Sequence, residues 1–405
     1  MVSLIPMLAS VTPAVGIGAA AVALAAGTGM FMLQKKQNKK SGERHGAERF
    51  CMLSRIDGRR ESYGARTYPE GITLARFCED FRNWSAYRLG LYYGIDDVRR
   101  FVAGLGVSKL MILQGMSGTG KTSLAHAFGA FTDNFSTVIP VQPMWKERTD
   151  LLGYYNEFTK RFNETLFLQK MYEASYSRDM YVTVLDEMNI ARVEYYFAEF
   201  LSLLELPDAE QRTVEIVSDT WENDPALLTD GRLRLPDNMW FVGTANNDDS
   251  TFAISDKVYD RAMVLNLDGK SEPFRAPKTQ KTPISAERFR ALCEEAEGEY
   301  ALSRRNLRRL EELDRYLISR FRVTFGNRIM NQIRRYVPIY VACGGTETEA
   351  LDDILAKKVL RKLETQNPIY LRHAAEELIA FIDGLFGEDR MPICKETVRR
   401  LQRNA

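Results

Sequence analysis

The stretch Gly115-Met-Ser-Gly-Thr-Gly-Lys-Thr122 matches the phosphate-loop pattern G-x-x-x-x-G-K-[ST]. A strand-like apolar run at residues 110–114 precedes it, and a helix-like run at residues 123–128 follows it. A loop in this setting turns backbone N–H groups toward a phosphate that lies at the positive end of the next helix. The stretch therefore predicts a binding site for a nucleoside triphosphate.

The side chains of this loop have different expected roles. Lys121 would reach the β- and γ-phosphates, and the hydroxyl of Thr122 would take one position on Mg²⁺. The glycines would let the backbone approach the anion closely. The nucleotide-binding residues expected from the loop are Gly115, Ser117, Gly118, Thr119, Gly120, Lys121, Thr122 and Ser123.

Polar side chains follow two further strand-like runs. Asp186 and Glu187 come directly after residues 181–185, and Asn246 follows residues 240–244. Ligands bind at the carboxyl ends of strands in a doubly wound sheet, so these side chains are expected beside the loop. We expect Asp186 to bind the phosphates and hold Mg²⁺, Glu187 to polarise the attacking water, and Asn246 to help position that water.

The composition is that of a globular protein and limits the classes of partner. The 405 residues contain 55 Lys and Arg against 54 Asp and Glu, so no broad basic surface for nucleic acid is expected. The five cysteines show no C-x-x-C spacing and the three histidines lie far apart. This argues against a zinc site and for reduced thiols in the cytosol.

The chain divides into an alternating part and a helical part. Five apolar runs, at residues 109–114, 137–141, 181–185, 240–244 and 262–267, predict a parallel sheet between helices. A segment with three prolines, at residues 268–283, then leads to helical patterns near residues 285–299, 303–322, 327–342, 347–365, 370–383 and 396–403. We expect a three-layer αβα domain over residues 67–275 and an all-α domain over residues 276–405.

The N-terminal region differs from the rest. Residues 14–33 form an uncharged, largely apolar stretch of 20 residues, long enough to span a bilayer as a helix, and four lysines follow it between positions 35 and 40. Residues 1–34 are thus predicted to be a single-pass anchor in the cell membrane, with the remaining chain in the cytoplasm. A disordered tail or a buried helix is the alternative. Residues 35–66 read as a basic, flexible tether whose lysines could bind anionic lipid or only flank the anchor.

Several motifs together resemble the AAA+ ATPases, in the branch of McrB, MoxR and dynein-related proteins. Besides the phosphate loop, the matching stretches are Val141-Gln-Pro-Met-Trp145, Asp150-Leu-Leu-Gly-Tyr154, Leu185-Asp-Glu-Met-Asn189, Arg234-Leu-Pro-Asp-Asn238 and Val242-Gly-Thr-Ala-Asn246. The resemblance covers about residues 90–365. It implies an αβα core with a helical lid, a ring that is usually a hexamer, and ATP hydrolysis at the subunit interfaces.

Two arginines gain roles from this resemblance. Arg261 matches the arginine finger that reaches the γ-phosphate of the neighbouring subunit, and Arg328 matches the second sensor, which would contact the γ-phosphate in its own subunit. Tyr92 and Tyr93 lie where the family often packs the base, although a core aromatic pair is equally possible. Residues 154–167 could face a ring pore and grip a partner, or form a packed hairpin.

The functional expectation combines these features. The arginine of the McrB sensor signature is missing from residues 245–251, which favours ATP over GTP. We expect the apolar segment and the tether in place of the DNA-reading domain of McrB. We expect a membrane-tethered ATPase that forms a homo-oligomeric ring and remodels a partner protein, as MoxR-like chaperones do, without contacting nucleic acid directly. A McrB-like motor that drives a nuclease, and a nucleotide-dependent scaffold with little turnover, remain alternatives.

Overall fold

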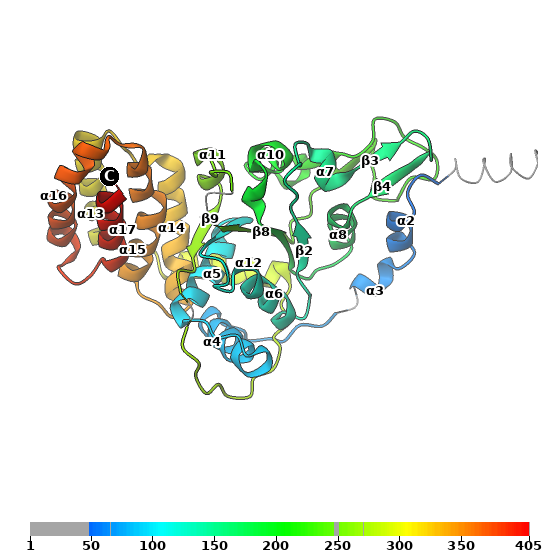
Figure 1. The fold of residues 1–405 in the computed structure, drawn as a ribbon. Helices are drawn as coiled ribbons and strands as arrows, with labels where there is room; N and C mark the ends of the chain where they lie inside the picture. Colours follow the sequence, from blue (N-terminus) through cyan, green and yellow to red (C-terminus); the bar gives the residue numbers. More distant parts are fainter. Residues whose placement is uncertain (1–47, 65, 247–250, 270, 405) are drawn as a thin grey trace, which may run out of the picture.

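A computed structural model describes residues 48–64, 66–246, 251–269 and 271–404. An α/β core lies at the centre of the molecule, with a helical domain on one side and a small hairpin on the other (Figure 1). The predicted α/β core followed by C-terminal helices is therefore confirmed.

The core is built on a five-stranded parallel sheet with the strand order β2-β5-β8-β1-β9. The strands are β1 (Leu110–Gly115), β2 (Thr137–Pro140), β5 (Tyr181–Asp186), β8 (Met239–Asn246) and β9 (Met263–Asn266). All five correspond to apolar runs identified in the sequence. Because the strands are parallel, the phosphate loop after β1 and the acidic pair at the end of β5 lie at the same edge of the sheet.

Both faces of the sheet are covered by helices, and the side chains of β1 alternate between two cores. Met111 and Leu113 belong to the core that contains α4 (Leu74–Trp84), α5 (Ile95–Val107) and α6 (Lys121–Phe131). Leu110 and Ile112 belong to the core that contains α8 (Leu166–Ala174) and α10 (Ala198–Leu203). A strand buried on both faces has no polar face, which explains its continuous apolar sequence.

Shorter elements complete the core. They are the π-helical turn η1 (Ser85–Leu89), α7 (Arg148–Leu152), β3 (Gly153–Asn156), β4 (Arg161–Glu164), η2 (Met188–Ile190), α9 (Val193–Tyr196), η3 (Ala209–Gln211), β6 (Thr213–Glu215), β7 (Arg232–Arg234) and α11 (Asp256–Tyr259). Outside the main sheet, β3 pairs with β4 and β6 pairs with β7, both as antiparallel hairpins.

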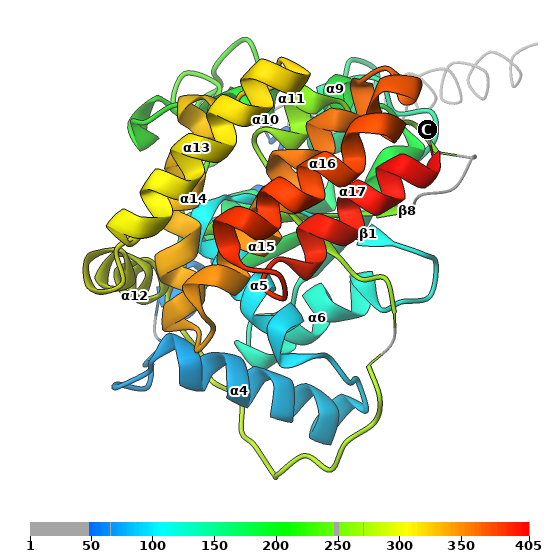
Figure 2. The ribbon, with the colours of Figure 1, turned by 90° about the vertical axis from the view of Figure 1, so that its left-hand side faces the viewer.

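The C-terminal helices pack side by side (Figure 2). They are α12 (Ala286–Glu299), α13 (Arg304–Phe321), α14 (Gly326–Ala342), α15 (Glu347–Lys358), η4 (Leu360–Thr365), α16 (Pro368–Phe386) and α17 (Pro392–Asn404). We expected α12 to belong with this domain. α12 packs along α14, and its Phe289 also lies edge-on against Trp240 of β8, with ring centroids 5.9 Å apart, so this helix contacts both the helical domain and the core.

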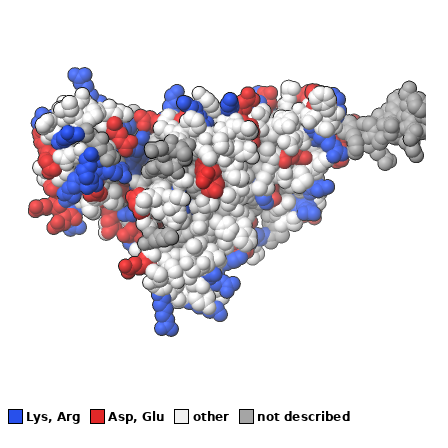
Figure 3. All heavy atoms as spheres, viewed as in Figure 1, with Lys and Arg blue, Asp and Glu red and all other residues white. Residues whose placement is uncertain are grey.

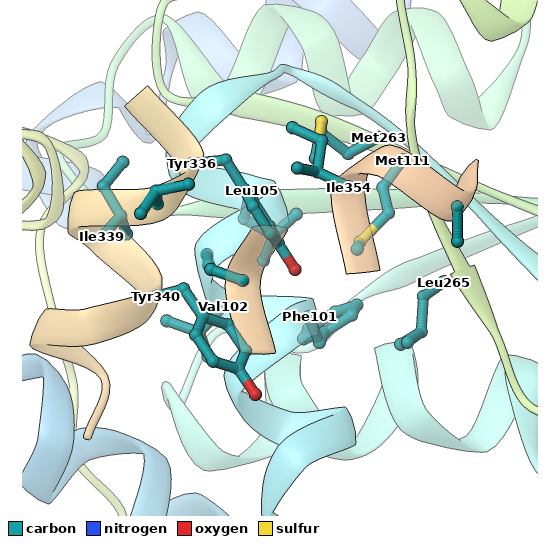
Figure 4. Packing of buried hydrophobic residues seen from close by; sticks show 14 of the residues in the cluster. Phe101, Val102, Leu105, Met111, Met263, Leu265, Tyr336, Ile339, Tyr340 and Ile354 are labelled. Carbon is teal, nitrogen blue, oxygen red and sulfur yellow. The ribbon is translucent and has the colours of Figure 1, made fainter. Parts of the chain in front are cut away.

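The helical domain joins the core mainly through α14. Figure 4 shows Tyr336, Ile339 and Tyr340 of this helix beside Phe101 and Leu105 of α5. The two helices approach closely: a Cβ on Gly106, at the end of α5, would lie 3.1 Å from a methyl carbon of Ile339. This contact places the start of α14 near the amino end of β1.

Part of the predicted tether is folded. Residues 35–66 were expected to be flexible, but α2 (Met52–Asp57) and α3 (Arg60–Gly64) are helical, and Phe50 and Leu53 are fully buried. Phe50 stacks on Phe162 of β4, and Glu164 accepts hydrogen bonds from the first backbone N–H groups of α2. The burial comes from contacts with a distant hairpin, which the local polar sequence does not reveal.

The predicted membrane anchor lies outside the described residues. From Glu48 onward, leaving aside the gaps, the structure contains no helix long and apolar enough to cross a membrane. On the face seen in Figure 3, charged side chains gather over the helical domain, and the centre of the face is largely uncharged. Over the helical domain, Lys and Arg side chains of the described residues lie among Asp and Glu side chains.

Candidate functional site

The phosphate loop joins β1 to α6 in a conformation that needs its glycines. Gly118 and Gly120 have φ of +79° and +93°, in the left-handed region that glycine adopts without strain. Gly115 has φ of +143°, and a Cβ there would lie 2.2 Å from the carbonyl oxygen of Leu267. The amine of Lys121 donates to the carbonyl oxygens of Gly115 at 2.9 Å and Met116 at 2.7 Å. The lysine side chain therefore crosses the bend of the loop.

The loop opens into a cavity of about 250 Å³ at the carboxyl edge of the sheet. Most of the residues predicted for the site line it, together with Thr244, which had no predicted role. The lining residues are Ser117, Gly118, Gly120, Lys121, Thr122, Ser123, Asp186, Glu187, Thr244 and Asn246. Gly115 and Thr119 do not line it: Gly115 packs behind the loop, and the hydroxyl of Thr119 donates to the carbonyl of Met116.

Asp186 is the centre of the polar contacts in this cavity. One of its carboxylate oxygens accepts hydrogen bonds from the hydroxyls of Thr122 at 2.7 Å and Thr244 at 2.9 Å. A carboxylate and a hydroxyl this close, beside a phosphate loop, are the donor set that Mg²⁺ uses in phosphate-loop proteins. The residues present therefore fit the predicted magnesium ion.

Glu187 follows in a strained conformation. Its φ is +53°, which is unfavourable for a residue with a side chain, and its N–H donates to the hydroxyl of Thr244 at 2.8 Å. Thr244 therefore binds both members of the acidic pair, through donation to Asp186 and acceptance from Glu187. In this left-handed conformation, Glu187 directs its side chain to the wall of the cavity.

Asn246 ends β8 opposite the loop, where it pairs in register with Gly115. Its carbonyl oxygen accepts a hydrogen bond from the side-chain amide of Asn189 at 3.0 Å. Asn189 is buried, and its own amide oxygen has no hydrogen-bond partner in the described part of the chain. We did not predict roles for Thr244 or Asn189. The spacing of two between Thr244 and Asn246 along a strand was the available signal, because it places both on one face.

The two predicted arginines lie at the other edge of the sheet. Arg261 precedes β9, and its backbone carbonyl accepts a hydrogen bond from Ser108, just before β1. Its guanidinium pairs with Glu205 at 2.7 Å, and Arg328 pairs with the other oxygen of the same carboxylate. Both arginines line a separate hollow of about 390 Å³.

Arg261 therefore lies away from the nucleotide cavity of its own chain, and its role as an arginine finger stays a prediction. Arg328 differs from the expectation that it contacts the γ-phosphate in its own subunit. The reason is the packing of α14 along α5, which brings the start of α14 to the amino ends of the strands.

The two tyrosines before the core, Tyr92 and Tyr93, lie in different surroundings. The ring of Tyr93 lies next to Gly120 of the phosphate loop, and its buried hydroxyl has no partner among the described residues. Burial raises the pKa of this hydroxyl well above its usual value. Tyr92 instead packs edge-on against Phe274, with ring centroids 5.6 Å apart. Of the two, only Tyr93 adjoins the loop.

The segment expected either to grip a partner or to pack is a hairpin, formed by β3 and β4. Phe158 at its tip is 100% exposed, whereas Tyr155 packs edge-on against Trp221. The hairpin therefore presents one aromatic side chain to solvent and uses another for attachment.

Comparison with known proteins supports this description of the core. Residues 110–262 match the family described as AAA domain (dynein-related subfamily), and residues 278–405 match a Domain of unknown function (DUF8727). No curated protein matches at a significant level.

Two solved structures show weaker likeness. A proposed ATPase from Cytophaga hutchinsonii is 12% identical, with a TM-score of 0.46 over 85% of this chain and 98% of that one. A full-length MCM homolog from Methanopyrus kandleri is 10% identical, with a TM-score of 0.39 over 72% of this chain and 64% of that one. These scores are too low to establish a shared fold. The family match over residues 110–262 and the cavity geometry together support an ATPase with an AAA-like core.

Proposed function

We propose that this chain hydrolyses ATP in an oligomeric ring and uses the energy to remodel a partner protein, with its N-terminal segment tethered to the cell membrane. The observation that carries hydrolysis is the convergence of Lys121, Thr122, Asp186, Glu187 and Asn246 on one cavity. A scaffold that only binds nucleotide would not need the acidic pair.

The residues of the cavity divide the work. Lys121 binds the phosphates, and Thr122 with Asp186 would hold Mg²⁺, which neutralises charge on the phosphate oxygens when bound. Glu187 accepts the proton of the attacking water, and Asn246 orients that water from the neighbouring strand. Thr244 keeps Asp186 and Glu187 in place through its two hydrogen bonds.

The position of Arg261 and Arg328 favours assembly into a ring, with a hexamer as the expected size. Both guanidinium groups lie at the sheet edge opposite the cavity of their own chain. In a ring this edge would face the nucleotide of the next subunit. There a guanidinium stabilises the charge that develops on the γ-phosphate during transfer, as arginine fingers do. Arg328 is proposed to act beside Arg261 on the neighbour.

The exposed aromatic tip of the hairpin favours a protein partner. A single projecting ring such as Phe158 contacts apolar segments of a peptide without needing a defined sequence. The near-zero net charge and the uncharged centre of the face in Figure 3 do not favour DNA as the partner. The McrB-like alternative would require a nuclease that copurifies with the protein and hydrolysis that DNA stimulates.

Three variants test the proposal. Lys121→Ala is expected to lose binding of a fluorescent ATP analogue, whereas Glu187→Gln should bind it normally and lose phosphate release. Arg261→Ala should also lose turnover, but mixing it with Glu187→Gln should restore part of it, because each variant supplies what the other lacks. If Glu187→Gln hydrolysed ATP at the wild-type rate, the assignment of the base would be wrong. If the mixture stayed inactive, Arg261 would not act in trans.

A further inference from the structure

The turn that carries Arg261 is held by a buried lysine of the helical domain. Lys358, the last residue of α15, donates hydrogen bonds to the carbonyl oxygens of Tyr259, at 2.6 Å, and Ala262. These two carbonyls lie on either side of Arg261. Lys358 is only 4% exposed and forms no ion pair with a carboxylate in the described part of the chain. Burial lowers its pKa to about 7.

Two further side chains of the helical domain reach the same turn. Gln332 of α14 donates to the carbonyl oxygen of Asp260 at 3.0 Å. Arg361 of η4 places its guanidinium 3.8 Å from the centre of the Tyr259 ring and pairs with Asp256 at 2.5 Å. The helical domain therefore contacts the turn both before and after the arginine, through side chains from α14, α15 and η4.

The other side of the turn is connected to the phosphate loop. The hydroxyl of Tyr259 is hydrogen-bonded to the side-chain amide of Gln114, the residue that immediately precedes Gly115. Tyr259 thus lies between the strand that leads into the loop and the helical domain. A hydrogen-bonded turn between two rigid elements follows their relative movement more closely than a free loop does.

We infer that Lys358 is a positioning residue through which the helical domain of each subunit sets the place of its own Arg261 at the neighbouring subunit's nucleotide. The inference rests on the proposed function, in which Arg261 acts in trans. Lys358 itself touches no nucleotide: it holds the backbone on both sides of the arginine. Without its two hydrogen bonds the Tyr259 and Ala262 carbonyls lose their buried donor, and the guanidinium loses its fixed position.

The test compares Lys358→Met with Lys362→Met. Methionine keeps the length and apolar character of the lysine stem and removes the donor. Lys362 lies one turn later, in η4, and makes no hydrogen bond with the turn in the described residues, so it is the matched control. Lys358→Met is expected to lower the rate of ATP turnover at least tenfold, because a displaced arginine finger loses part of a contribution of roughly 10³ to 10⁵. Binding of a fluorescent ATP analogue to the isolated subunit should be unchanged, and Lys362→Met should match wild type in both assays.

Mixing experiments separate positioning from a general effect on the fold. Rings of Lys358→Met mixed with Glu187→Gln should hydrolyse more ATP than the two variants do separately, because Glu187→Gln subunits supply a placed arginine to intact neighbouring cavities. Arg261→Ala combined with Lys358→Met should be no slower than Arg261→Ala alone. Gln332→Met removes one hydrogen bond to the turn and should lower the rate of ATP turnover less than Lys358→Met does. It replaces Lys358→Met in the test if that variant does not fold.

The outcomes are distinguishable. Wild-type turnover in Lys358→Met and Gln332→Met, weakened nucleotide binding in the isolated variant, or no recovery in the Lys358→Met mixture when the Arg261→Ala mixture recovers would overturn the role of Lys358 and leave the proposed function intact. Absence of ATP turnover in the wild-type protein would overturn the proposed function and the inference with it.

Discussion

Replacing Thr244 by valine should slow ATP hydrolysis while nucleotide binding persists. Valine has nearly the same shape as threonine and keeps the buried methyl group in β8. It removes the hydroxyl that donates to Asp186 at 2.9 Å and accepts from the N–H of Glu187 at 2.8 Å. Glu187 has φ of +53°, so the hydroxyl supports a residue that would otherwise relax toward negative φ.

The size of the effect follows from the two lost hydrogen bonds. Each contributes a net of about 0.5 to 1.5 kcal/mol, so the pair contributes about 1 to 3 kcal/mol. If the whole loss falls on the placement of the acidic pair in the transition state, the rate decreases about 5- to 150-fold, since about 1.4 kcal/mol corresponds to tenfold. Lys121 and the loop glycines are untouched, so the affinity for a fluorescent ATP analogue should change little.

The assay is phosphate release at saturating ATP, with thermal unfolding measured in parallel. Thr183→Val is the control, because Thr183 is a buried threonine of the adjacent strand β5 that does not line the cavity. Wild-type turnover in Thr244→Val would refute the reasoning. An equal loss in Thr183→Val would assign the effect to the sheet as a whole.

Three further predictions concern other parts of the chain. Gly115→Ala should weaken nucleotide binding roughly 5- to 150-fold, because a Cβ 2.2 Å from the Leu267 carbonyl forces the loop to shift at a cost of about 1 to 3 kcal/mol. Gly64→Ala is the control for this binding assay, because a Cβ at position 64 meets open space. Between about pH 7 and pH 10.5, the free energy of unfolding of wild type should rise relative to that of Lys358→Met, by up to about 1.4 kcal/mol per pH unit. The reason is that Lys358 loses its proton at the lowered pKa in the folded chain and keeps it in the unfolded chain. Denaturant titrations across this range measure the difference, and parallel curves for the two proteins would contradict the prediction. Deleting residues 1–34 should move the protein from the membrane fraction to the soluble fraction, and continued sedimentation with membranes would indicate attachment elsewhere.

The sheet and the cavity could be predicted from the sequence because their signals are local. Each core strand is a short apolar run, and the phosphate loop, the acidic pair and Asn246 follow three of these runs directly. Parallel strands bring their carboxyl ends to one edge, so local order along the chain was enough to assemble the site.

What could not be predicted depends on packing between distant segments. The place of Arg328 is set by the contact of α14 with α5, in which Tyr340 lies beside Val102 and other side chains of α5 (Figure 4). Glu205, which pairs with both predicted arginines, has no motif of its own because it lies in the turn after a short helix. Thr244 resembled any threonine in a buried strand, and only the register of β8 against β5 brings it to the acidic pair.

The folded N-terminal segment has a consequence for how force would pass through the protein. Arg49 is buried between Asp219 and Asp224 and accepts a backbone hydrogen bond from Phe162 of the β3–β4 hairpin. A pull on the chain ahead of Glu48 would therefore load the base of the hairpin that carries Phe158 before it reached the nucleotide cavity. The described part of the chain therefore begins at the base of the same hairpin whose tip carries the exposed ring of Phe158.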